Sequence, residues 1–462
     1  MLLRPLTFAL ALALLPASAF AEDLMQAYQL ARQSDPQLSA AESGRLATRE
    51  GAVQARAALL PQINGTATLN HRRGDSTSNQ TQFDEDGNLV VYPVSSSSTN
   101  TSRGLDVGAR QAIYDRSNYT RLRSQRAIAE ASDFQLQAAG DSLITRTSQA
   151  YFNVLVALET LNASQAQEEA LRRQFDFADK RLEVGLAPIT DVHEARARYD
   201  AARANTIITR NALADALQAL AEITGDTIVD FKALPDDFQP QLPVGRDAEA
   251  WVATAVDNNP SLRAKQLQVR ASEHDVDTAR AGHWPTLYAS AGYGDSRSWG
   301  ESNARGFDMP SDSSSRGPSV GLTLSVPIFS GGATQSRVRQ AIAQRDMAQD
   351  ELEQQRRALV RNTRNAWQTL VGGISEVEAR RLAVVSARSA FDASQVGLEV
   401  GTRTVLDVLN NQQILFNAER EYALARYTYL QNRLLLEQAA GTLEVTNLQD
   451  INRLLTRDIS AR

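Results

Sequence analysis

The 462-residue chain contains one unit written twice. Asp35-Pro36-x-Leu38 in the first half matches Asn259-Pro260-x-Leu262 in the second, 224 positions later. Further along, Leu182-Glu183-Val184-Gly185 matches Leu398-Glu399-Val400-Gly401, 216 positions later. Two ungapped series of matches predict a duplicated fold. The predicted repeats are 22–225 and 248–441, joined by a linker at 226–247 and followed by a C-terminal segment at 442–462.

A period-two pattern near the start of each repeat predicts β-strands. Apolar and polar residues alternate at 63–69 and 287–293, and again in returning segments at 105–113 and 320–328. Alternation over about 10 residues fits a strand of a membrane barrel, with one face toward lipid and one toward a lumen. We therefore predict β-hairpins at about 62–114 and 286–329, each with a long polar loop, at 74–102 and 294–318. An ordinary soluble hairpin with one wet face fits the same alternation.

Long helical patterns fill most of the remaining chain. Residues 116–184 and 332–400 contain no proline, and their apolar residues recur every three or four positions. At 1.5 Å per residue, each helix would reach roughly 100 Å, which indicates an extended coiled-coil-like assembly. Returning helices are expected at about 188–223 and 403–440, giving helical hairpins at about 116–224 and 332–440. One further helix is expected at the start of each repeat, at about 23–58 and 248–282.

The N-terminus has the pattern of a secretory signal peptide. Arg4 precedes the apolar run Leu6–Leu15, and Ala19-Phe20-Ala21 is a small-x-small cleavage site, so residues 1–21 are predicted to be removed. No later apolar run approaches the roughly 20 residues that a membrane-spanning helix needs. Entry into a membrane would therefore require a closed β-barrel, because lipid offers no partners to unpaired backbone groups.

Composition and strand number narrow the function further. The formal net charge of -6 gives no basis for nucleic-acid binding. The chain has no cysteine, which excludes disulfides, thiolate metal sites and cysteine nucleophiles. Four strands per chain cannot close a barrel. Three chains supply twelve strands and leave a channel, whereas two supply eight and a filled bore. We therefore expect a homotrimer, with the dimer as the alternative.

Several longer stretches resemble the TolC family of outer-membrane factors across the whole mature chain. The most specific are Asp23–Tyr28, Leu59–Gln62, Ala150–Leu155, Val184–Val192 and Val400–Leu409. The resemblance implies a mixed α and β fold that trimerises into a twelve-stranded β-barrel continued by a periplasmic α-helical barrel. It also implies export across the outer membrane of a Gram-negative bacterium, by drug efflux or type I protein secretion. The implied partners are outer-membrane lipid, a periplasmic adaptor protein and an inner-membrane pump of RND, MFS or ABC type. A stand-alone passive pore and a periplasmic structural or adhesive coiled-coil protein are the alternatives.

The resemblance also assigns a closed gate at the periplasmic end. Its matching positions are Thr190 and Asp191 near one hairpin tip and Arg403 near the other. Two departures predict a closure that is either looser or linked differently: Leu398 replaces a family tyrosine, and Gln395 replaces a glutamate whose partner position keeps Gln174. An ordinary surface ion pair is the alternative role for Asp191 and Arg403.

The narrowest point of the pore and the docking tips are assigned in the same way. Asp407 matches the first of two aspartate rings, whereas Asn410 stands at the second, so we expect a cation preference with half the family's charge. The adaptor-docking tips are Val184, Gly185 and Leu186 in the first repeat and Val400, Gly401 and Thr402 in the second.

No pattern of residues predicts catalysis or a cofactor. The four histidines, His71, His193, His274 and His283, lack metal-ligand spacing, and no phosphate loop or nucleophile motif occurs. The sequence therefore predicts a transport protein without a metal site and not an enzyme.

Overall fold

The computed structural model describes residues 23–461 apart from residue 187, 243–246 and 305–306. The predicted signal peptide, residues 1–21, lies outside the described residues. The chain divides into two compact units. A sheet unit comprises 45–132 and 264–352, and a hairpin unit comprises 23–44, 133–263 and 353–461.

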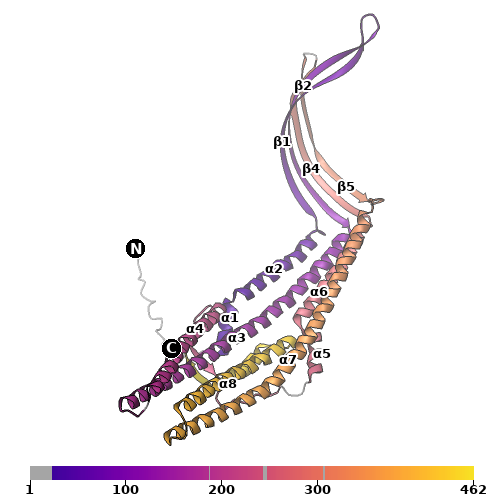
Figure 1. Cartoon of the computed structure of the whole chain (residues 1–462). Helices are drawn as coiled ribbons and strands as arrows, with labels where there is room; N and C mark the ends of the chain where they lie inside the picture. The colour runs from indigo at the N-terminus through magenta and orange to yellow at the C-terminus, as the bar shows by residue number, and fades with distance from the viewer. Residues whose placement is uncertain (1–22, 187, 243–246, 305–306, 462) are drawn as a thin grey trace, which may run out of the picture. The chain divides into compact units, whose positions relative to one another are not determined.

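Four antiparallel strands form the sheet of the first unit (Figure 1). They are β1 (Gln62–Phe83), β2 (Leu89–Tyr114), β4 (Thr286–Ala304) and β5 (Phe307–Ser325), in the spatial order β1-β2-β4-β5. Each repeat thus contributes one hairpin, as predicted. The outer edges of β1 and β5 have no partner strand among the described residues.

The register aligns one apolar row across all four strands. Ile63 pairs with Ala109, Ala109 with Ala291, and Ala291 with Val320. Ile63 is 70% exposed and Val320 is 86% exposed, so this face has no cover within the chain. The opposite face carries the row Asn64, Gly108, Gly292 and Ser319, which has polar side chains at its two ends and glycine between them. The predicted alternation of apolar and polar faces is confirmed.

The long polar loops predicted at 74–102 and 294–318 are wrong. These segments continue the strands, which run for 19 to 26 residues, and the first hairpin turns only at 84–88. In that turn Asp84 accepts from the backbone of Asn88 at 2.7 Å, and Gly87 has a φ of 80°. The serine- and threonine-rich composition suggested loops, yet the hydroxyls pair across the strands, as Ser76 does with Ser96 at 3.2 Å.

The long helices match their predicted extents. They are α3 (Arg116–Glu183), α4 (Ile189–Thr224), α7 (Ala333–Glu399) and α8 (Val405–Ala440). Helices α3 and α7 begin in the sheet unit, and both helical hairpins turn within the hairpin unit. No helix in the described part of the chain is both long enough and apolar enough to cross a membrane.

The single helices predicted at 23–58 and 248–282 are each two helices. The structure has α1 (Leu24–Ser34) with α2 (Pro36–Ala57), and α5 (Ala248–Asn258) with α6 (Pro260–Ala281). Proline lacks an amide hydrogen and forces the residue before it out of the helical conformation. Asp35 and Asn259 stand at these breaks and cap the next helix, accepting from Leu38 at 2.8 Å and from Leu262 at 3.1 Å.

The hairpin unit has one main core, formed where both repeats meet. It includes α9 (Val445–Asn452) and the strand pair β3 (Asp230–Ala233) and β6 (Arg457–Ser460). Tyr151 of α3 is fully buried, with its ring 5.4 Å from that of Phe231. Its hydroxyl donates to the Lys232 carbonyl at 3.1 Å. Fully burying a large apolar side chain stabilises a fold by about 2 kcal/mol. This cluster therefore holds the two helical hairpins together at this position along their length.

Candidate functional site

A glycine in the left-handed conformation closes each helical hairpin. Gly185 has a φ of 74°, and its amide donates to Leu182 at 2.9 Å, while that of Leu186 donates to Arg181 at 2.7 Å. Gly401 has a φ of 78° in the second hairpin. A side chain with a Cβ is strained in this conformation, which explains glycine at both positions.

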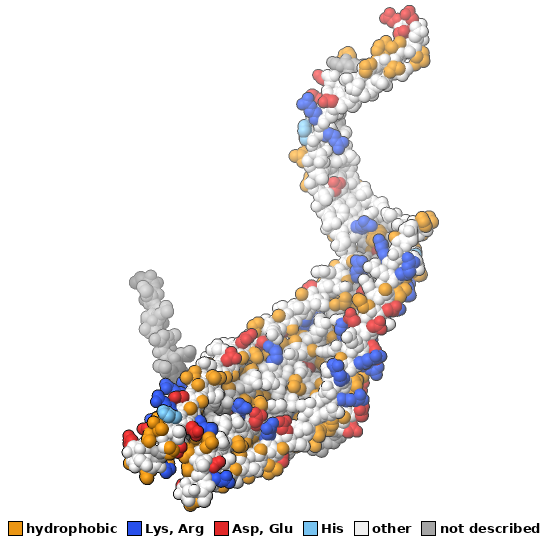
Figure 2. Space-filling model, viewed as in Figure 1, with side chains coloured by type: hydrophobic (Ala, Val, Ile, Leu, Met, Phe, Trp, Pro, Cys, Tyr) orange, Lys and Arg blue, Asp and Glu red, His pale blue; other side chains and the backbone are white. Residues whose placement is uncertain are grey.

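Apolar side chains project from both turns. The exposed fractions are 67% for Val184, 67% for Leu186 and 68% for Val400. Figure 2 shows such hydrophobic side chains on the surface of the hairpin unit. Adaptor docking at these two turns stays a prediction.

The predicted latch residues lie at the tips but do not meet within one chain. Thr190 and Asp191 are in the first turn of α4, and Arg403 precedes α8. Within the described residues, neither Asp191 nor Arg403 forms an ion pair. The stem of Arg403 lies against α7 instead, where a Cβ added to Gly397 would be 2.6 Å from its Cγ.

The three substituted gate positions are spread over α3 and α7. Gln174 of α3 has a buried Nε2 without a hydrogen-bond partner in the chain. On α7, Gln395 is exposed and Leu398 is half-buried. Their gate roles stay predictions.

The structure does join the two hairpins at Asn410, the position of the second predicted pore ring. Arg198 of α4 donates from Nη2 to Asn410 Oδ1 of α8 at 3.1 Å. Nearby, Gln167 of α3 donates to Gln413 of α8 at 2.6 Å. Sequence analysis missed Arg198, Gln167 and Gln413, because their partners lie more than 200 residues away along the chain.

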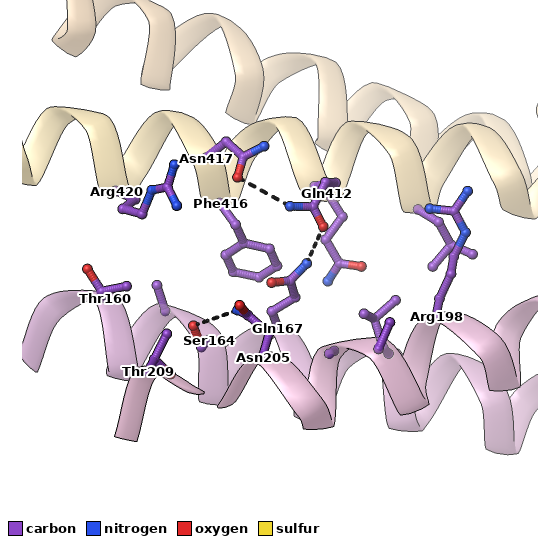
Figure 3. Close-up of a pocket in the computed structure, with 16 residues that line it drawn as sticks. Thr160, Ser164, Gln167, Arg198, Asn205, Thr209, Gln412, Phe416, Asn417 and Arg420 are labelled. Carbon is purple, nitrogen blue, oxygen red and sulfur yellow. Dashed lines mark hydrogen bonds between the residues drawn. The ribbon is translucent and has the colours of Figure 1, made fainter. Parts of the chain in front are cut away.

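A polar cavity of about 350 Å³ separates α3, α4 and α8 at this level (Figure 3). Its polar lining consists of amides, hydroxyls and two guanidinium groups, with Phe416 between them. Within the same lining, Leu171, Ala202 and Leu409 form a small apolar cluster. Contacts between the hairpins here combine this apolar cluster with uncharged or exposed polar pairs.

Asp407, the predicted pore carboxylate, also caps α8. Its carboxylate accepts from the Thr404 backbone at 3.0 Å and from the Thr404 hydroxyl at 2.9 Å. These hydrogen bonds hold the pKa of Asp407 below its usual value. A ring of three such carboxylates in a trimer would oppose this effect by mutual repulsion.

Comparison with known proteins decides the family. The model for "Outer membrane efflux protein" matches residues 27–226 and 251–442, which is most of the chain. The chain belongs to the outer membrane efflux protein family.

Relatives and solved structures of this family agree with the assignment. The chain is 36% identical to "Outer membrane protein TolC" of Escherichia coli over 99% of this chain and 90% of the relative. It is 30% identical to "Alkaline protease secretion protein AprF" of Pseudomonas aeruginosa, over 95% and 88%. The crystal structure of the Campylobacter jejuni CmeC outer membrane channel superposes with a TM-score of 0.73 at 17% identity, covering 94% of this chain and 90% of that one. The predicted duplicated fold of strands and long helical hairpins is confirmed, and so is the outer-membrane location.

Deeper in the hairpin unit, this outer membrane efflux protein has a buried ionic junction. Glu159 of α3 accepts from Arg426 of α8 at 2.9 Å, from Arg457 of β6 at 2.8 Å and from Tyr427 at 3.0 Å. The side chains of Arg426 and Glu159 are 4% and 12% exposed. Burial, with the nearby Glu159 charge, raises the pKa of Tyr427 and keeps its hydroxyl a donor. The hairpins are therefore held firmly here and loosely toward the tips.

The described part of the chain holds no candidate metal centre. In the described ranges, no three histidine, aspartate or glutamate side chains come close enough together to hold an ion.

Proposed function

We propose that three copies of this chain form one export duct through the outer membrane, opened at its periplasmic end by partner proteins. One observation carries the proposal: an exposed apolar row crosses a four-stranded sheet whose two edge strands are unpaired among the described residues. Lipid tolerates an apolar face but no open edge, so β5 of one copy must pair with β1 of the next. Three copies supply twelve strands, enough to leave a channel.

The cargo and partners follow from the kinds of relative. Names in the family refer to efflux and to protease secretion, and we extend both tasks to this chain as drug efflux and type I secretion. An inner-membrane pump would energise transport, and a periplasmic adaptor would dock on Val184, Leu186 and Val400. We assign the chain no catalytic role.

The gate is part of the proposal. Thr190, Asp191 and Arg403 would close the tips through contacts with neighbouring copies or after a small shift, and Asp407 would face the lumen. Opening would separate α4 from α8 near the tips and leave the Glu159 junction in place.

Cysteine cross-linking tests the trimer. The chain has no cysteine, so introduced ones report without background. Asn64→Cys in β1, combined in turn with cysteines at Gly317, Ser319, Gly321 and Thr323 of β5, should give dimers and closed trimers on oxidation. Gly108→Cys in β2, an inner strand, paired with the same β5 positions is the matched control and should give no ladder. A protein that stays monomeric in every combination would contradict the duct.

A deletion strain tests the task. Loss of the gene should raise susceptibility to drugs or remove secreted proteins from the medium, and the intact gene should restore either. Restoration of neither, with the protein present in the outer membrane, would favour a passive pore.

A further inference from the structure

The cavity between α3, α4 and α8 has a lining with an unbalanced charge. It contains Arg198 and Arg420 and no aspartate or glutamate. Arg198 donates one hydrogen bond from Nη2 to the neutral side-chain amide of Asn410. Arg420 meets Glu421, which lies outside the lining, in a contact exposed to water. Each guanidinium carries further N–H donors beyond that one contact, so the two together favour an anionic ligand in the cavity.

The remaining lining specifies the body of that ligand. Phe416 lies between the two arginines (Figure 3), and the ring is accompanied by Leu171, Leu409 and the methyls of alanines. Amides surround it, including Gln412, which is 7% exposed. An aromatic core would stack on Phe416 while its polar edges meet the amides.

The spacing of the arginines indicates two anionic ends. Arg198 bonds to Asn410 of α8, and Arg420 is ten residues further along the same helix. The helix rises about 15 Å over the ten residues from Asn410 to Arg420, and Figure 3 places Arg198 and Arg420 on either side of Phe416. A cavity of about 350 Å³ is within the size range of small-molecule sites.

We propose that this cavity binds an aromatic organic dianion, which bridges the two helical hairpins. The bound molecule would contact α4 through Arg198 and α8 through Arg420 and Phe416. A ligand that binds only while the hairpins are together stabilises that state. The effect on the gate depends on the proposed export function, whereas binding itself does not.

Binding to the purified, detergent-solubilised full chain tests the proposal. The probe is biphenyl-4,4′-dicarboxylate, followed by isothermal titration, with the uncharged biphenyl-4,4′-dicarboxamide and inorganic phosphate as comparison ligands. We expect saturable binding of the dicarboxylate alone. Arg198→Gln and Arg420→Gln should each weaken it about tenfold, which corresponds to about 1.4 kcal/mol and is at the low end for one charged hydrogen bond.

Arg203→Gln is the matched control, because Arg203 is exposed on the same helix as Arg198 and does not line the cavity. Arg198→Lys keeps the positive charge but lacks the planar guanidinium group. It is the second variant in case Arg198→Gln does not fold. The dicarboxylate should raise the thermal midpoint of the wild type and not that of Arg198→Gln. No saturable binding, equal binding of the dicarboxamide or phosphate, or an equal loss in Arg203→Gln would each overturn the site. Because no membrane or pump is involved, these results are independent of the export tests.

Discussion

The guanidinium of Arg426 lies 2.9 Å from the carboxylate of Glu159, and both are almost fully buried. This pair joins α8 of the second repeat to α3 of the first. Toward the tips, the joining contacts become neutral or exposed, from Gln167 with Gln413 to Arg198 with Asn410. With such a gradient, we expect the tips to separate while the two hairpins stay attached at the ionic junction.

Breaking the buried pair should unfold the junction. Glu159→Ala leaves Arg426 charged and without its carboxylate, so we expect a loss of about 3 kcal/mol in the free energy of unfolding. Glu169→Ala is the control, since its pair with Arg173 is exposed and should contribute at most about 1 kcal/mol. Thermal unfolding followed by circular dichroism measures both. Equal effects of the two substitutions would show that the junction is not a stability centre.

Single-channel conductance should show which residues hold the gate closed. Arg403→Ala should raise single-channel conductance in planar bilayers if it latches the tips, and Arg198→Ala should raise it by freeing Asn410. Arg203→Ala, exposed on α4, should leave it unchanged. An unchanged conductance in Arg403→Ala removes that residue from the gate. A rise in Arg198→Ala alone places the closure at the contact between Arg198 and Asn410.

The charge at Asp407 should set ion selectivity. Asp407→Asn should weaken the cation preference measured by reversal potentials, with exposed Asp392→Asn as the control. Hydrogen bonds from Thr404 lower the pKa of Asp407, and repulsion among three carboxylates in a trimer opposes this, so the cation preference should vanish as pH falls through the resulting pKa. Thr404→Ala removes the hydroxyl donor and should move this loss to higher pH. An identical pH profile in that variant would contradict the capping role.

The free energy of unfolding should fall as pH rises, because Glu437 ionises in a buried position. Burial raises its pKa to about 7, offset in part by Arg433 and reinforced by Asp450. A carboxyl whose folded pKa exceeds its unfolded value stabilises the fold at low pH, and this contribution is lost as pH rises through the folded pKa. Glu437→Gln should thus be more stable than the wild type above that pKa, by on the order of 3 kcal/mol, and similar to it at about pH 4. Thermal midpoints across pH check this, with exposed Glu194→Gln as the control. A stability gain that is equal at all pH values would point to packing instead.

The exposed tips should matter only when a partner is present. Leu186→Ser should reduce export in cells and co-purification with the adaptor while leaving bilayer conductance unchanged. Ile208→Ser on α4 is matched in exposure, 66% against 67%, and should change none of these. Full adaptor binding by Leu186→Ser would exclude this tip from docking.

The sequence by itself determined the repeat, the long helices and the tips. Proline-free segments, periodic apolar residues and a glycine after each long helix are local signals, and local signals decide where a helix runs and ends. The Asp35-Pro36 and Asn259-Pro260 pairs carried the signal for the two helix breaks as well, although we predicted continuous helices there. Alternation likewise identified the apolar face on which Ile63 and Val320 lie.

Tertiary structure alone decided how far the strands extend and which polar residues meet. The serine-rich segments extend as strands because backbone pairing, not side-chain type, propagates a hairpin once its register is set. Arg198 contacts Asn410, and Glu159 contacts Arg426, although each pair is separated by more than 200 residues of chain. Such partners depend on how helices pack in three dimensions, which no local pattern encodes, and for that reason the ionic junction and the cavity between the hairpins became visible only in the folded chain.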